Sequence, residues 1–375
     1  QQVVNRPDQE TSSRVSGSEI ISSNSKTSYN GNYGLNASWT LYNGNKRLKT
    51  IQQEKLNNQV AELDVATSEN NIQESIAQVY IQILYAAESV KVNESTLQVS
   101  IAQRDRGQEL LNAGSIAKSD FAQLEAQVST DRYQLVTAQA TLEDYKLQLK
   151  QLLELDGENE MNIYLPALSD ENVLAPLPTK KDVYIRALSL RPEIEASKLN
   201  VEASELGIGI AKSSYLPTIS LSAGIGTNHT SGSDFTFGEQ VKNGWNNSIG
   251  LSVSVPIFNN RQTKSAVQKA KLQYETSMLS LLDEQKTLYK TIEGLWLDAN
   301  SAQQRYAAAN EKLKSTQISY ELISEQFNLG MKNTIELLTE KNNLLQAQQE
   351  QLQAKYMAIL NMQLLKFYQG DQLAI

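Results

Sequence analysis

Cysteine is absent from this 375-residue chain, and histidine occurs only once. Without cysteine, the chain can form neither a disulfide framework nor a thiolate metal site. The single histidine, His229, lies in a stretch rich in Ser, Thr, Gly and Asn, where we expect a solvated loop residue. No nucleophile–base pair, phosphate loop or metal cluster is recognisable, and acidic residues on long helices usually form solvated faces. The sequence therefore predicts no metal site and no cofactor, and it does not favour an enzyme.

Positively charged residues are fewer than negatively charged ones. The chain carries 34 Lys and Arg residues against 42 Asp and Glu residues, for a net charge of −8. This balance argues against a nucleic-acid-binding protein, which shows a basic footprint. No run of about 18 apolar residues exists, which excludes a transmembrane helix, and Gln1 opens into polar sequence with no signal-peptide pattern. Membrane β-strands stay possible, because their alternating residues do not raise hydropathy averaged over a window.

Proline is scarce and unevenly placed. The seven prolines lie at positions 7, 166, 176, 178, 192, 217 and 256. The stretches 8–165 and 257–375 therefore contain none, and proline is the residue that breaks helix interiors. Both stretches are rich in helix-forming Gln, Leu, Ala, Glu and Lys. We predict four long helices at 45–112, 117–154, 261–328 and 333–367, and two shorter ones at 180–190 and 193–213. The first would span roughly 100 Å at about 1.5 Å per residue, a length that requires a coiled-coil-like neighbour.

The chain contains a long internal duplication. Leu35–Asn43 resembles Leu251–Asn259, and the offset is 251 − 35 = 216. Asn112-Ala113-Gly114 matches Asn328-Leu329-Gly330 at the same offset, since 330 − 114 = 216. Two distant matches at one offset indicate a duplication without gaps between them. Each copy is predicted to hold a β-ribbon, a long helix, a glycine turn and a returning helix, since glycine suits the left-handed position after a helix.

Three segments, 32–41, 217–226 and 248–257, alternate strictly between apolar and small polar residues. Each is about ten residues long, the length of a tilted strand across a bilayer. An ordinary half-buried antiparallel sheet also explains such alternation. The uncharged polar face and the long Ser-, Asn-, Thr- and Gly-rich connections at 11–31 and 227–247 favour strands that face lipid. The residues assigned to the lipid face include Leu35, Trp39, Ile219, Leu221, Leu251 and Val253.

The duplication also predicts a fourth strand. The counterpart of 217–226 falls at about 1–10, where Gln1-Gln2-Val3-Val4 fits loosely. We therefore expect the chain to begin inside its first strand, with a segment missing before it. Four strands cannot close a membrane barrel, which needs about eight, and an open edge in lipid leaves backbone groups unpaired. Three protomers would supply twelve strands around a cyclic axis.

The chain resembles the outer membrane efflux proteins typified by TolC over its whole length, apart from that missing segment. The resemblance rests on the glycine turns at Gly114 and Gly330 and on three short motifs. These motifs are Arg191-Pro192-Glu193-Ile194, Ala211-Lys212-Ser213-Ser214-Tyr215-Leu216-Pro217 before a strand, and Val255-Pro256-Ile257-Phe258-Asn259 before a long helix. It implies an α+β membrane protein: a trimeric twelve-stranded β-barrel in the outer membrane of a Gram-negative bacterium, continuing as a coiled-coil α-helical barrel through the periplasm. It also implies a passive exit duct for a tripartite efflux pump or for type I secretion.

The resemblance places a gate at the periplasmic helix turns. The family pattern has an aspartate six residues after the first glycine, which falls on Asp120. In the second copy the gate positions fall on Phe327, Lys332 and Glu336, and a second acidic position falls on Thr339. The pattern has Tyr and Arg at the first two, so Phe327 lacks a hydroxyl and Lys332 lacks bidentate geometry. Glu340 is the candidate substitute for the second acid. The alternative interpretation is that these residues form a solvated helix face.

The same resemblance implies partners: a homotrimer, a periplasmic adaptor protein, an inner-membrane pump and outer-membrane lipid. The adaptor would dock at the turns, on Asn112, Ala113, Gly114, Ser115, Asn328, Leu329, Gly330 and Met331. A competing interpretation is a soluble coiled-coil scaffold with a small β cap. We divide the chain into a first β-hairpin with an external loop and a truncated first strand (1–43), a first helical hairpin (44–154), a connector (155–190), a helix (191–214), a second β-hairpin (215–259), a second helical hairpin (260–367) and a tail (368–375).

Overall fold

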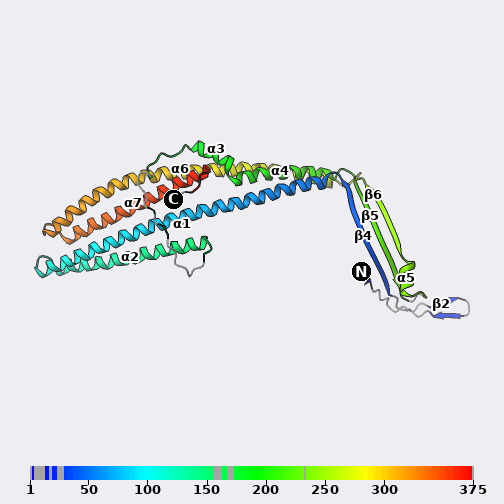
Figure 1. Cartoon of the computed structure of the whole chain (residues 1–375), viewed down its shortest axis with the longest axis horizontal. Coiled ribbons are helices and arrows are strands. Elements are labelled where there is room, and N and C mark those ends of the chain that lie inside the picture. The colour runs from blue at the N-terminus through cyan, green and yellow to red at the C-terminus, as the bar shows by residue number, and fades with distance from the viewer. Residues whose placement is uncertain are drawn as a thin grey trace. The chain divides into compact units, whose positions relative to one another are not determined.

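The computed structural model describes residues 2–3, 13–16, 19–22, 29–155, 163–164, 166, 173–231 and 234–373. The rest of the strand predicted at 1–10, most of the predicted connector between 156 and 172, and residues 374–375 of the tail lie outside the described residues. The chain forms two compact units. One contains Gln1–Asn57 and Asn200–Ser277, and the other contains Asn58–Leu199 and Met278–Ile375. Figure 1 labels their elements.

The first unit is built on an antiparallel sheet. Its strands are β1 (Gln2–Val3), β4 (Asn30–Asn43), β5 (Thr218–Thr230) and β6 (Asn246–Ser254), in the order β1-β4-β5-β6. The expected fourth strand is therefore represented by β1, which pairs with β4. A separate hairpin of β2 (Ser13–Ser16) and β3 (Glu19–Ser22) lies within the segment predicted as a loop at 11–31. The strand predicted to reach residue 257 ends at Ser254, two residues before Pro256, which has no N–H to donate to a ladder.

The strand register places apolar residues of three strands on one face. Trp39 lies opposite Leu221, which lies opposite Leu251. Ile219 pairs with Val253, and Leu35 pairs with Ile225. All six residues predicted to face lipid thus share one face, because side chains alternate along each strand. The exposed fractions of Leu35, Leu251 and Val253 are 73%, 66% and 59%, so the described residues leave this part of the face uncovered.

One residue departs from the predicted alternation. The ladder between β4 and β5 shifts between Thr40 and Tyr42. This bulge adds one residue to β4, and Tyr42 then stands opposite Ile219. The extra residue, Leu41, was not predicted, because a bulge cannot be read from strict alternation.

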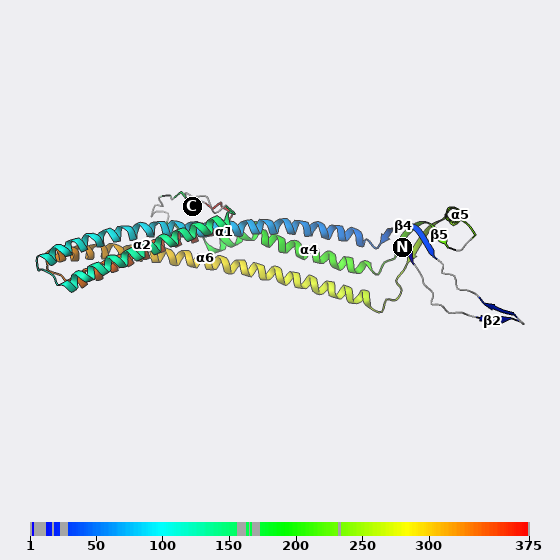
Figure 2. The same ribbon diagram turned by 90° about the horizontal axis from the view of Figure 1, so that it is seen from below.

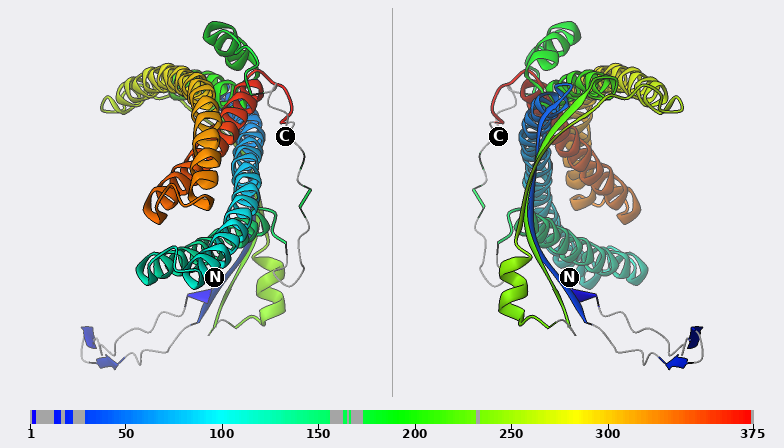
Figure 3. Two further views of the ribbon diagram at one scale, coloured as in Figure 1. Left: turned by 90° about the vertical axis from the view of Figure 1, so that its left-hand side faces the viewer. Right: turned by 90° about the vertical axis from the view of Figure 1, so that its right-hand side faces the viewer.

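A short helix follows β5, where the sequence analysis expected a loop at 227–247. Helix α5 (Phe237–Asn243) begins with a capping box, in which the Thr236 side chain and the Glu239 carboxylate each accept a backbone N–H of the other residue. Thr227 Oγ1 donates to the Val241 carbonyl at 2.9 Å, so α5 lies beside β5 (Figure 3). The Phe237 ring packs 5.0 Å from His229. His229 is therefore a half-buried strand residue, and the solvated-loop interpretation is wrong.

The predicted helices are all confirmed. They are α1 (Lys46–Asn112), α2 (Lys118–Leu152), α3 (Lys180–Leu190), α4 (Pro192–Ser213), α6 (Gln262–Asn328) and α7 (Thr334–Tyr368). The duplication is visible in their bounds, because adding 216 to both ends of α1 gives α6, and adding it to α2 gives α7. Helix α4 begins with Pro192 at its first position, where the missing N–H costs nothing. No helix among the described residues is long and apolar enough to cross a membrane.

The left-handed backbone positions repeat as well. Every described residue with positive φ has a counterpart 216 residues away, and the four pairs are Gly44 with Asn260, Asn45 with Arg261, Gly114 with Gly330, and Glu154 with Gly370. Each pair marks the same boundary in the two copies: the start of a long helix, its turn, or the end of the returning helix. Since non-glycine residues rarely adopt this conformation, the repeat retains the backbone geometry even where the side chain has changed.

The apolar core of the second unit gathers around α7. One cluster includes Ile81, Leu84, Tyr306, Ile359 and Leu364, and another includes Val183, Ile194, Ile292, Leu365 and Phe367. The connector before α3 is fixed by side chains of α6. Gln303 Nε2 donates to the carbonyls of Val173 and Ala175, and Trp296 Nε1 donates to the carbonyl of Pro178 at 3.0 Å.

Replacing either turn glycine should destabilise its turn through backbone strain alone. Gly114 and Gly330 both have φ +72°, and a Cβ at either position would meet nothing within 4 Å. Gly114→Ala and Gly330→Ala should each cost about 1–2 kcal/mol, the penalty of left-handed backbone, and should speed amide hydrogen exchange around the turn. Gly294→Ala is the matched control. It also has open space but lies inside α6, so it should stabilise its helix by about 0.5–1 kcal/mol. Equal effects at all three positions would contradict this account.

Candidate functional site: the two helix turns

The turns between α1 and α2 and between α6 and α7 lie at the same end of the second unit (Figures 1 and 2). Both have the same hydrogen bonds. In the first turn, Gly114 N donates to the Leu111 carbonyl and Ser115 N donates to the Leu110 carbonyl. In the second turn, Gly330 N donates to the Phe327 carbonyl and Met331 N donates to the Gln326 carbonyl. This pattern is the Schellman motif, which requires a left-handed residue at the glycine position.

The two turns present different side chains to solvent. The first carries the small residues Ala113 and Ser115, whereas the second carries Leu329 and Met331, which are 75% and 70% exposed. The eight residues predicted as the docking tips therefore all lie on or beside these turns, and the apolar exposed surface belongs to the second.

Asp120 lies at the start of α2 and acts locally as a helix cap. Its Oδ2 accepts the backbone N–H of Ala117 at 3.3 Å. Ala117 itself occupies the N-cap position and has no side chain that could accept a hydrogen bond. A carboxylate in the first turn also interacts favourably with the helix dipole. In one protomer the side chain of Asp120 is thus only partly engaged.

Lys332 and Glu336 form an ion pair one helical turn apart, with Nζ and Oε1 separated by 2.5 Å. Glu336 Oε2 also accepts the backbone N–H of Asn333, whose side chain accepts the Glu336 N–H in return. The hydrogen bond from Lys332 and that from the Asn333 backbone lower the pKa of Glu336. Within the described part of the chain no ion pair joins Asp120 to Lys332, so the structure does not bring these two predicted gate residues together.

The remaining predicted gate residues take different positions. Phe327 is only 3% exposed, so its ring packs inside the helical hairpin. Thr339 is exposed, and its hydroxyl donates to the Ile335 carbonyl of its own helix at 2.7 Å. Glu340, the candidate substitute for the second acid, accepts a hydrogen bond from Ser319 of α6 at 3.1 Å. Glu340 thus joins the two helices of the second hairpin.

A buried charge cluster, which the sequence did not predict, surrounds Arg191. Arg191 is 7% exposed; its Nε donates to Glu193 at 2.7 Å, and its NH1 and NH2 approach Glu74 of α1 at 3.5 Å. The guanidinium also lies 4.3 Å from the ring centre of Tyr368 at the end of α7. Burial raises the pKa of Glu74 and raises that of Tyr368 to about 12. The Arg191-Pro192-Glu193-Ile194 motif signalled this place, but Glu74 and Tyr368 are too distant in sequence to be identified from it.

Comparisons with known proteins identify the family. A sequence model described as "Outer membrane efflux protein" matches residues 7–154 and 183–370. This match covers most of the chain and both helical hairpins. The chain therefore belongs to the outer membrane efflux protein family.

Individual relatives are distant. The outer membrane efflux protein BepC of Brucella suis is 24% identical over 290 residues, which cover 77% of this chain and 60% of BepC. The outer membrane protein TolC of Escherichia coli is 23% identical over 311 residues, which cover 80% of this chain and 62% of TolC. The alkaline protease secretion protein AprF of Pseudomonas aeruginosa is 21% identical over 297 residues, covering 79% and 60%. The chain thus matches about three fifths of the length of these relatives.

Solved structures show the same fold. A crystal structure of CusC superposes with a TM-score of 0.79 at 20% identity and covers 97% of this chain and 82% of CusC. The outer membrane protein VceC of Vibrio cholerae superposes with a TM-score of 0.74 at 16% identity, covering 97% and 86%. At these identities the likeness establishes the fold alone.

Removing the Arg191 guanidinium should be far more damaging than removing an exposed ion pair. Arg191→Met would leave the partly buried carboxylates of Glu74 and Glu193 without their cation, at a cost of about 3–5 kcal/mol. Lys198→Met is the control, because its pair with Glu195 at 2.9 Å is exposed and is worth about 0–1 kcal/mol. Thermal unfolding followed by circular dichroism measures both. Similar midpoint shifts for the two variants would contradict the structural role of Arg191.

Proposed function

We propose that three copies of this chain form a passive exit duct in the outer membrane of a Gram-negative bacterium. The observation that carries the proposal is the sheet, which has one apolar, solvent-exposed face and two edges that pair with no other described strand. Residues on this face, such as Leu35, Leu251 and Val253, carry no charge along three strands. The opposite face is small and polar, as Asn36, Gly224 and Ser248 lie side by side. This alternation fits lipid outside and water inside a barrel.

Closure by further copies satisfies the sheet edges. Strands β1 and β6 end the four-stranded sheet, and unpaired backbone groups in lipid cost several kcal/mol each. Three protomers with four strands each make a barrel of twelve strands, within the range of membrane barrels. A soluble scaffold would leave the apolar face in water, so we do not favour it.

The long helical hairpins form the periplasmic part of the duct in this proposal. Their turns, with the exposed Leu329 and Met331, are the docking points for a periplasmic adaptor that joins the duct to an inner-membrane pump or a type I secretion machine. Support comes from the family and from the names of two relatives, since BepC is an outer membrane efflux protein and AprF an alkaline protease secretion protein. The chain contributes a conduit with no chemistry of its own.

The gate of the proposed duct lies between protomers. Asp120 does not pair with Lys332 in its own chain, and its carboxylate is only partly engaged. In a closed ring, Asp120 of one protomer would face Lys332 and Glu336 of its neighbour. One exposed pair contributes only about 0.2–1 kcal/mol, but three symmetric copies act together on a single opening. Phe327 would support the turn from inside the hairpin, and Thr339 would line the approach.

Removing either partner of this latch should open the duct. Asp120→Ala and Lys332→Ser should each raise single-channel conductance in planar lipid bilayers. Lys314→Ser, which removes an exposed charge from α6 well before the turn, should leave conductance unchanged. Wild-type conductance in both latch variants would refute the latch.

A charge on the apolar sheet face should prevent membrane assembly. Val253→Arg should cost up to about 2–4 kcal/mol, the cost of an Arg at the bilayer midplane. Ser252→Arg is the matched control, because the neighbouring residue points to the polar face opposite Ser220. We expect Ser252→Arg to assemble in outer-membrane fractions and Val253→Arg to be lost from them. Normal assembly of Val253→Arg would contradict the lipid-facing assignment.

A further inference from the structure

Helix α5 lies on the apolar face of the sheet. Strand β5 has no bulge, so Thr227 and His229 point to the same face as Leu221. Both are half-buried, whereas Asn228 and Thr230, which point to the other face, are exposed. The cover over Thr227 and His229 is α5, which lies beside β5 (Figure 3). This end of β5 is the one farther from the long helices, because the strand begins just after α4.

Hydrogen bonds fix α5 on the strand. Thr227 Oγ1 donates to the Val241 carbonyl, and Thr230 N donates to Gln240 Oε1, both at 2.9 Å. The Gln240 amide also donates to the Phe235 carbonyl at 2.8 Å. One side chain of the helix thus joins the strand to the segment that leads into the helix. These bonds give α5 a defined place on the sheet.

Aromatic side chains gather around α5 and stay exposed. Tyr33, Phe235, Phe237 and Trp245 are each at least half exposed. The Tyr33 and Phe237 rings meet edge to face, with their centres 6.3 Å apart. Rings left in water forfeit the free energy of burying their apolar surface. A membrane surface suits them better, because one side of the ring is then apolar and the other is wet.

Polarity changes stepwise along β4 toward these rings. Leu35 is the last aliphatic residue of the strand on the apolar face, Tyr33 lies two residues further from the long helices, and Gly31 lies two residues beyond it. The Tyr33 hydroxyl lies over Gly31, since a Cβ added there would meet it at 2.9 Å. The Tyr33 ring therefore points its polar end away from the aliphatic residues. The whole change takes about 14 Å of strand, at about 3.4 Å per residue.

We propose that α5 and the four exposed rings, together called the rim cluster, bind lipid on the outside of the barrel at the headgroup level of the outer leaflet. This rests on the proposed barrel, whose apolar face is the outer one. Continuity with that face identifies the occupant. Acyl chains cover Leu35 and its aliphatic neighbours, and the headgroups then meet the rings of Tyr33, Phe237 and Trp245. The rim cluster thereby sets the depth at which the barrel lies in the membrane.

The charges of α5 define the kind of lipid contact. The helix carries one acidic and one basic residue, Glu239 and Lys242. The Glu239 carboxylate is engaged with Thr236, from which it accepts both the backbone N–H and the hydroxyl hydrogen. A single remaining cation gives little attraction to an anionic surface. The contact therefore depends on placing rings among headgroups, and zwitterionic phosphatidylcholine should suffice as the partner.

Tryptophan fluorescence tests the depth of each position. The chain has three tryptophans. Trp39 lies on the apolar face, Trp245 in the rim cluster and Trp296 in the second unit. Variants that keep one of them, with the other two changed to Phe, are reconstituted in vesicles of phosphatidylcholine brominated near the headgroup or near the end of its acyl chains. We expect the deep bromines to quench Trp39 most and the shallow bromines to quench Trp245 most. Trp296 should be quenched by neither.

Two further variants, made with all three tryptophans changed to Phe, separate the helix from the strands. Phe237→Trp places the probe on α5 and should be quenched most by the shallow bromines, as Trp245 is. Asn32→Trp is the matched control, because Asn32 lies next to Tyr33 but on the polar face. It should not be quenched by brominated lipid. Adding anionic phosphatidylglycerol should change neither result.

The outcomes distinguish the rim cluster from the barrel. Quenching of Trp39 without quenching of Trp245 would overturn the rim cluster and leave the barrel standing, since α5 would then lie in water or against another protein. Absence of quenching at Trp39 would refute the proposed barrel, and the rim cluster with it. The Trp245 measurement leaves α5 and its contacts unchanged, so it decides the proposal even if Phe237→Trp fails to fold.

Discussion

Unpaired backbone at the two edges of the sheet is the constraint on which the rest of this structure depends. Strands β1 and β6 end the sheet, and their outer edges pair with no other described strand. One face of the sheet is apolar and exposed. In water, the backbone groups of the edges can bond to solvent, but the apolar face is unfavourably exposed. In lipid, the apolar face is favourably placed, but the backbone groups of the edges have no hydrogen-bond partner. Closure of several copies into a barrel satisfies both. In the proposed duct, the long helical hairpins form a ring of the same symmetry.

The fold was predictable from the sequence because its signals are long and repeated. Scarce proline and an offset of 216 located every long helix, and strict alternation located three strands. The sequence failed to predict two local features. A bulge adds Leu41 to β4 between Thr40 and Tyr42, and a capping box at Thr236 begins α5 in a segment predicted as a loop. A bulge leaves no periodic signal. A helix of seven residues is too short for periodicity to reveal.

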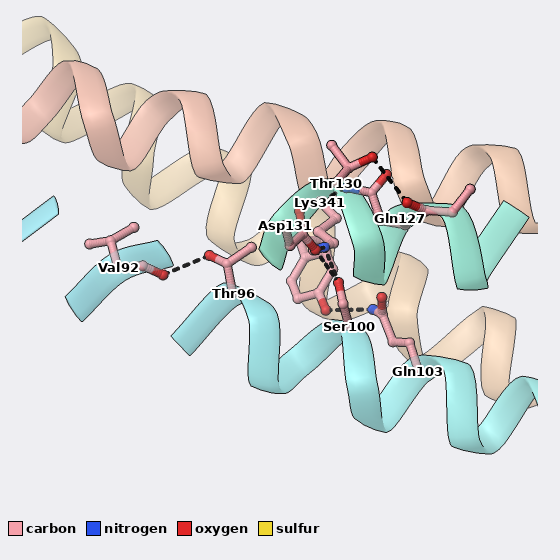
Figure 4. Close-up of polar contacts among 10 residues, drawn as sticks. Val92, Thr96, Ser100, Gln103, Gln127, Thr130, Asp131 and Lys341 are labelled. Carbon is pink, nitrogen blue, oxygen red and sulfur yellow. Dashed lines mark hydrogen bonds and ion pairs between the residues drawn. The ribbon is translucent and has the colours of Figure 1, made fainter. Parts of the chain in front are cut away.

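Site residues could be predicted from the sequence only where the residue type and its position indicate the role without a distant partner. Glycine after a long helix identified both turns, and their left-handed backbone explains why. Residues that act through distant partners could not be found. Lys341 and Asp131 form a buried ion pair (Figure 4). They are 210 positions apart, and nothing in the sequence distinguishes either from the other charged residues of the long helices. Arg191 was visible through its motif, yet its carboxylate partner Glu74 lies 117 positions earlier.

The number of chains in the assembled protein tests the account most directly. Native mass spectrometry of the protein purified from outer membranes in detergent measures that number. The account predicts three chains per particle, since three sets of four strands close one barrel. A particle that is monomeric in detergent, or a protein recovered from the aqueous fraction without detergent, would contradict it.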